Sequence, residues 1–182
     1  MRTKELALAS LFASLTSLGA YIVIPLWPVP VTMQTFFLYL AIVIGGWKVA
    51  TLSQVIYLAV GLAGLPVFAG AKSGVQAFLG PTGGYLIGFV FASLVGGLLL
   101  VKEKSRIRIL ISLIVATLII YIFGYLYLSL WLHLIKGEEI ASAFYTAFTV
   151  GILPFLIGDV LKMIAVFSIA SSKRIKSLGD LP

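Results

Sequence analysis

Residues 107–134 read IRILISLIVATLIIYIFGYLYLSLWLHL, an apolar run with one arginine near its start. An α-helix needs about 20 mostly apolar residues to cross the roughly 30 Å hydrocarbon core of a bilayer, and this run exceeds that length. The rest of the chain has the same character, because 61% of its 182 residues are hydrophobic and only 10% are charged. Soluble domains carry about 25% charged residues. The sequence therefore predicts an all-α integral membrane protein.

Other apolar runs flank this one and bring the expected number of transmembrane helices to six. Prolines 25, 28 and 30 end the first run, because proline lacks a backbone donor and disfavours helix in the residue before it. A tight turn at Gly45–Lys48 separates the second run from the third. No soluble domain is expected, so residues 1–182 are predicted to form a single six-helix membrane domain. The five other runs are Leu6–Ile24, Thr32–Ile44, Val49–Leu62, Gly84–Val101 and Ala141–Ser171.

Basic residues are distributed unevenly between the two ends of the predicted helices. If both termini are cytoplasmic, only Lys72 and Lys136 lie outside, and Lys162 lies within the sixth run. This distribution obeys the positive-inside rule, so the chain is expected to be a multi-pass membrane protein with both termini in the cytoplasm. The net charge of +7 then reflects topology rather than nucleic-acid binding. The inside residues are Arg2, Lys4, Lys48, Lys102, Lys104, Arg106, Arg108, Lys173, Arg174 and Lys176.

Two ionisable residues, Asp159 and Lys162, lie within a predicted membrane helix. A charge at the centre of a bilayer costs about 2.5–3.5 kcal/mol on insertion scales, so such residues mark functional sites by default. A spacing of three residues places both on one face of the helix. Asp159 and Lys162 can bind a polar ligand together, or they can form a purely structural ion pair.

The segment Gly61–Gly88 contains eight of the eighteen glycines together with Pro66 and Pro81. It is apolar enough to enter the membrane but too rich in glycine and proline to form one helix. Irregular backbone at that depth is stable only where protein or a water-filled cavity covers it. The segment is therefore predicted to be a partly re-entrant outer loop between helices 3 and 4, and the alternative is a flexible connector.

Two further patterns indicate contacts without identifying the partner. Gln34, near the start of the second run, can both donate and accept hydrogen bonds and so suits an amide-like or urea-like ligand, although a capping or packing role fits equally well. Ala9 and Ala13, with Ser10 and Ser14, form a stripe of small residues that lets another helix approach closely. That helix can belong to the same chain or to another one.

Taken together, these motifs resemble the BioY family, the biotin-specific substrate-binding subunits (S components) of energy-coupling-factor transporters. The resemblance covers nearly the whole chain and departs from the usual pattern between Phe68 and Gly80, where Ala71, Lys72 and Ser73 replace a more glycine-rich stretch. The motifs are PVPVTMQ at residues 28–34, GLAGLPVF at 61–68, GPTGGYLIG at 80–88 and GDVLK at 158–162.

The resemblance implies an S-component-like bundle in the cell (plasma) membrane of a prokaryote. Such a bundle captures biotin on the extracytoplasmic side and has neither catalytic residues nor a cofactor. Its implied partners are a membrane coupling protein (EcfT-like), which would contact Ala9 and Ala13, and two cytoplasmic ATPase subunits. The implied ligand-binding residues are Asp159, Lys162, Gln34, Tyr85, Phe36, Phe68 and Ser73.

Three alternatives follow from the same sequence. An S component for another vitamin and a stand-alone biotin carrier would share most of these features. A membrane enzyme is disfavoured, because the single histidine, His133, lies near the outer end of the fifth run and is better explained as an interfacial residue.

Overall fold

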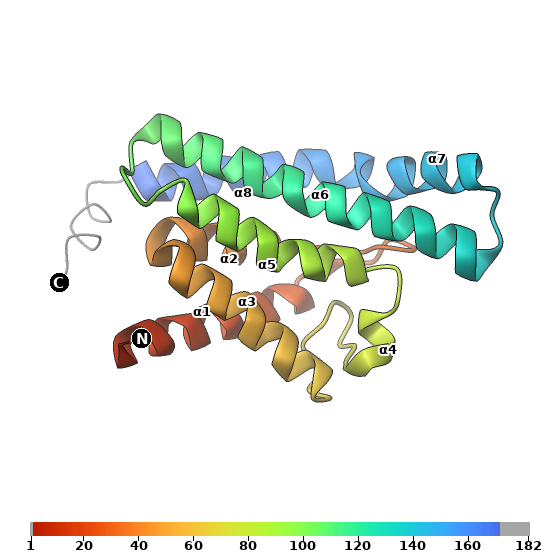
Figure 1. The fold of residues 1–182 in the computed structure, drawn as a ribbon, viewed down its shortest axis with the longest axis horizontal. Coiled ribbons are helices and arrows are strands. Elements are labelled where there is room, and N and C mark those ends of the chain that lie inside the picture. Colours follow the sequence, from red (N-terminus) through yellow and green to blue (C-terminus); the bar gives the residue numbers. More distant parts are fainter. Residues whose placement is uncertain (1, 172–182) are drawn as a thin grey trace.

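The computed structural model describes residues 2–171, which are mostly helical (Figure 1). A short antiparallel pair joins the first two helices, with Val23 opposite Thr32 and Ile24 opposite Val31. The elements are α1 (Thr3–Tyr21), β1 (Val23–Ile24), β2 (Val31–Thr32), α2 (Gln34–Leu40), the π-helical turn η1 (Ala41–Gly45), α3 (Gly46–Leu62), α4 (Gly74–Phe78), α5 (Gly83–Leu98), α6 (Arg106–Lys136), α7 (Ile140–Gly151) and α8 (Leu153–Ser171).

Within the described residues, three helical runs are long and apolar enough to cross a membrane: Gln34–Leu62, Arg106–Lys136 and Ile140–Ser171. The helix Gly83–Leu98 is apolar but shorter. In the first of the three runs, Gly46 has φ 67° and ψ −177°, an extended positive-φ conformation that is essentially restricted to glycine and interrupts the helix within the predicted turn. The chain is thus a multi-pass membrane protein, and the count of six transmembrane helices stays a prediction.

The helices pack side by side with their connections gathered at two opposite ends (Figure 1). The N-terminus, the α5–α6 loop and the end of α8 lie at one end, whereas α4 and the α6–α7 turn lie at the other. Most of the residues predicted to be cytoplasmic therefore share one end of the bundle. Of that set, Lys173, Arg174 and Lys176 lie outside the described residues.

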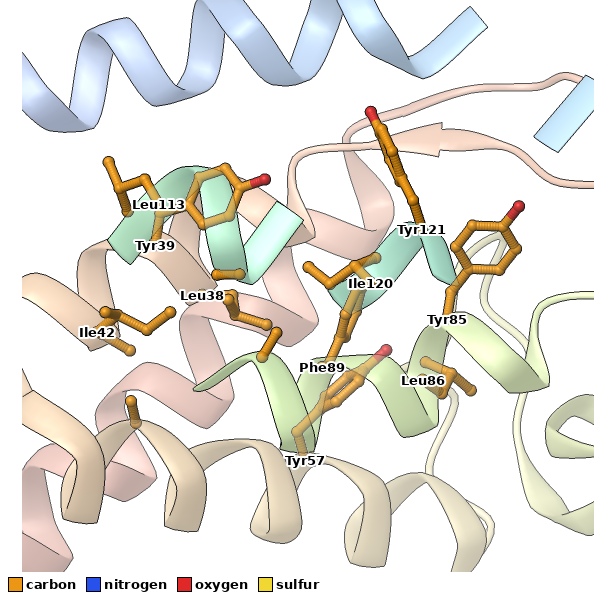
Figure 2. Packing of buried hydrophobic residues seen from close by; sticks show 14 of the residues in the cluster. Leu38, Tyr39, Ile42, Tyr57, Tyr85, Leu86, Phe89, Leu113, Ile120 and Tyr121 are labelled. Atoms are coloured by element: carbon orange, nitrogen blue, oxygen red, sulfur yellow. The ribbon is translucent and has the colours of Figure 1, made fainter. Parts of the chain in front are cut away.

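The core lies between α2, α3, α5 and α6 (Figure 2). Tyr57 on α3 directs its ring toward Leu86 and Phe89 on the facing helix α5 (Figure 2). The opposite face of α6 is exposed and apolar along its length, as expected for a surface whose solvent is lipid. That lipid-facing stripe contains Ile107, Ile111, Ile114, Leu118, Ile122, Leu126 and Leu130.

Candidate ligand-binding site

A cavity that is partly open to the outside of the protein lies where α2, α5, α6 and α8 meet the loops that precede α2 and α5. One part of the lining is polar and consists of Thr32, Gln34, Thr35, Tyr121, Asp159 and Lys162. Most of the remaining lining is apolar or aromatic and includes Val29, Phe68, Tyr85, Leu86, Phe89 and Phe155.

Asp159 accepts three hydrogen bonds in this cavity. The residue is 2% exposed, and its Oδ1 atom lies 2.8 Å from the Lys162 ammonium one turn further along α8. Oδ1 also accepts a hydrogen bond of 2.9 Å from the Thr35 hydroxyl, and Oδ2 accepts one of 2.8 Å from the Tyr121 hydroxyl. Because a carboxylate offers about four acceptor positions, these three donors leave room for one more.

Lys162 is 8% exposed and has its three ammonium protons matched by three acceptors within the chain. Its Nζ atom donates to the backbone oxygen of Thr32 at 2.7 Å, to the Thr35 hydroxyl at 3.0 Å and to Asp159 Oδ1 at 2.8 Å. A lysine ammonium has three donors and no acceptor. In this arrangement Lys162 holds Asp159 in place and ties α8 to the start of α2.

Gln34 extends the polar cluster toward α3. Its amide nitrogen donates to the Tyr57 hydroxyl at 2.5 Å, and its Oε1 atom accepts from the Thr32 hydroxyl at 2.8 Å. An amide has a second proton and a second lone pair. Gln34 therefore keeps capacity for a ligand while two neighbours fix its orientation.

Aromatic rings form the opposite wall of the cavity. Phe68, from the glycine-rich segment, folds back onto α3, where its ring lies edge-on to Tyr57 at a centroid distance of 5.6 Å. It fills the space that a side chain at Gly61 would need. Tyr85 stacks on Phe155 at 6.0 Å and donates a hydrogen bond of 2.8 Å to the backbone oxygen of Gly151. Figure 2 shows Tyr85 and Tyr121 approaching this region from α5 and α6.

The structure brings together five of the seven residues predicted to bind ligand, namely Asp159, Lys162, Gln34, Tyr85 and Phe68. Phe36 instead borders a neighbouring apolar groove with Met33 and Leu161. Ser73 precedes α4 and is absent from the cavity lining. The cavity lining also includes Tyr121, Phe89 and Phe155, which are not among the residues predicted from the sequence. For Tyr121 the available signal was a hydroxyl in the middle of a long apolar helix.

The structure does not place Ala9 and Ala13 on the surface of the bundle, where the resemblance implied contact with a coupling protein. They are 0% and 5% exposed, because α1 packs these small residues inward against the rest of the bundle. A neighbouring hydrogen bond of 3.3 Å joins Gln54 on α3 to Thr16 on α1. The stripe therefore serves an internal helix contact, and any outer surface of α1 is formed by other residues.

The chain resembles known proteins along almost all of its length. The model of the BioY family matches residues 1–178. The "Probable biotin transporter BioY" of Pyrococcus horikoshii is 41% identical over 170 residues, which are 93% of this chain and 96% of that protein. The "Biotin transporter BioY" of Thermotoga maritima is 39% identical over 175 residues, which are 96% of this chain and 97% of that one.

A solved structure has a similar fold. It is described as the S-component for biotin from an ECF-type ABC transporter. It superimposes with a TM-score of 0.80 at 26% sequence identity, and the match covers 97% of this chain and 95% of the other.

Proposed function

Because the chain belongs to the BioY family, we propose that it is the biotin-binding S component of an energy-coupling-factor importer and captures biotin on the extracytoplasmic side. The relatives described as biotin transporters and the fold shared with an S component for biotin support this proposal. The observation that carries it is the buried Asp159–Lys162 cluster beside an aromatic-walled cavity. Such a subunit binds and releases its ligand unchanged, so it is a transport protein and not an enzyme.

The chemistry of biotin matches the two parts of the cavity. Its bicycle carries a urea with two N–H donors and one oxygen acceptor, and its apolar chain ends in a carboxylate. The remaining acceptor position of Asp159 suits a urea N–H, and the Gln34 amide can pair with the urea oxygen. The rings of Phe68, Tyr85 and Phe155 offer apolar surface for the bicycle.

A thermal-shift screen of the purified protein in detergent tests the choice of vitamin. We expect biotin, without ATP, to raise the Tm, because a ligand at 100 times its Kd stabilises the folded state by about 2.7 kcal/mol. Thiamin and riboflavin at equal concentration are expected to leave the Tm unchanged. A shift with either of these two and none with biotin would identify an S component for another vitamin.

We further propose that the chain crosses the membrane six times with both termini in the cytoplasm, and that it works with a membrane coupling protein (EcfT-like) and two cytoplasmic ATPase subunits. Uptake of biotin in a host without those ATPases would instead indicate a stand-alone carrier. The burial of Ala9 and Ala13 moves the proposed docking surface to the outer face of α1. The exposed small residues there are Ala7, Ser10 and Ser14, which share one side of the helix.

Ser14→Trp is expected to abolish biotin uptake in cells while leaving biotin affinity in detergent unchanged. The indole would hold a partner helix away from α1, whereas Ser14 is exposed and is not part of the cavity lining. Ile122→Trp, on the lipid-facing stripe of α6, is the matched control and is expected to keep both activities. Normal biotin uptake by the Ser14→Trp variant would show that this face of α1 does not contact the coupling protein.

A further inference from the structure

We propose that Lys72, on the loop whose Phe68 lines the cavity, binds the ligand's carboxylate, so that the anionic end of the ligand points outward and its neutral end points inward. This inference rests on the proposed function and adds how the two ends of the ligand are distinguished. Lys72 is exposed and belongs to the loop between α3 and α4.

The polar end of the cavity is a poor place for a carboxylate. Among the described residues that line the cavity, the charged ones are Asp159 and Lys162, and their charges cancel at 2.8 Å. A carboxylate there would meet the like charge of Asp159, while the protons of Lys162 are already engaged by Thr32, Thr35 and Asp159. Burying a carboxylate without a free counter-charge is strongly unfavourable. The anionic end of the ligand therefore needs a partner elsewhere.

The loop that carries Phe68 supplies such a partner. Phe68 and Lys72 are paired across a narrow antiparallel bridge, with the Phe68 N–H donating to the Lys72 oxygen at 3.0 Å and the Lys72 N–H donating to the Phe68 oxygen at 3.3 Å. Residues directly opposite each other in such a bridge extend their side chains to the same face. Since Phe68 lines the cavity, its bridge partner Lys72 is placed to extend its side chain on the same face of the loop.

The turn between these two residues has a defined shape. Gly70 has φ 73° and Ala71 has φ 58°, so both adopt the left-handed conformation. A residue with a side chain rarely adopts this conformation and does so mainly where its surroundings require it. The turn thereby fixes the backbone of Lys72 beside Phe68, while the long flexible stem of the lysine lets its ammonium follow a ligand carboxylate.

The test compares biotin with its neutral methyl ester on Lys72→Arg, Lys72→Gln and Lys72→Glu by calorimetry at low ionic strength. We expect Lys72→Arg to bind biotin like the unmodified chain, and Lys72→Gln to bind it about threefold to fivefold more weakly, as for an exposed ion pair. Lys72→Glu is expected to bind biotin more weakly still. Affinity for the methyl ester is expected to be the same in all three variants, and high salt should reduce the differences seen with biotin.

Lys4→Gln makes the same change of charge at the opposite end of the bundle and is expected to alter neither affinity (Figure 1). Equal biotin affinity in Lys72→Gln and the unmodified chain would overturn the inference, as would an equal loss for biotin and ester, which indicates a structural role. A loss of more than about a hundredfold on esterification of the ligand would place the carboxylate in the buried cluster and also overturn it. If the unmodified chain binds neither compound, the proposed function itself fails.

Discussion

Replacing Asp159 with alanine is expected to weaken biotin binding by more than about tenfold, which corresponds to about 1.4 kcal/mol. The carboxylate is the acceptor for Thr35, Tyr121 and Lys162, and it keeps one position free for the ligand. Its removal deletes that ligand contact and also loosens the three side chains that shape the polar end of the cavity. Calorimetry with the purified variant measures the loss.

The same substitution leaves the Lys162 charge buried without its partner, a change that costs about 3–5 kcal/mol of stability in proteins. The double variant Asp159→Asn with Lys162→Met separates the two effects, because it removes both charges and leaves no unpaired ion. We expect this variant to keep most of its Tm without ligand and to show no stabilisation by biotin. Unchanged biotin affinity in Asp159→Ala would show that Asp159 and Lys162 form a structural ion pair and do not bind the ligand.

Replacing Gly124 with alanine is expected to lower biotin affinity by about tenfold. The new methyl group would occupy space taken by the Tyr85 ring, so Tyr85 would have to shift from its hydrogen bond with Gly151 and its stacking on Phe155. Such overpacking costs about 1–3 kcal/mol. Because Tyr85 forms part of the cavity wall, the displaced ring takes up room that the ligand needs.

Gly158→Ala is the matched control for this change. An added Cβ atom there would have only Val31 Cγ1 near it, at 3.9 Å, an ordinary van der Waals contact. This control is expected to bind biotin like the unmodified chain. If the Gly124 variant did so too, Tyr85 would not shape the ligand site.

Several features of this molecule follow from local chemistry and were predictable. Hydropathy indicates a membrane protein because the bilayer excludes charge, and the runs around residues 107–134 and 141–171 reappear as long helices. The spacing of Asp159 and Lys162 places them on one helix face, where the structure shows an ion pair. The interruption at Gly46 follows from the glycine pair that the sequence places there. One difference is the break at Ile152, which divides the last run into α7 and α8 just before Pro154.

Other features depend on tertiary packing, which no local pattern determines. Successive helical residues point about 100° apart, so Gln34 and Thr35 reach the cavity while Phe36 turns to the neighbouring groove. A stripe of small residues predicts a close helix contact, but Ala9 and Ala13 look the same in sequence whether the partner helix is internal or external. Tyr121 reaches Asp159 only because α6 packs against α8.

A structure of the chain determined with biotin bound is the most direct test of the ligand site. We expect the urea ring within hydrogen-bonding distance of Asp159, the bicycle against Phe68 and Tyr85, and the carboxylate directed toward Lys72. Density for biotin at another position, with the Asp159 and Lys162 side chains facing away from it, would show that this cavity is not the biotin site.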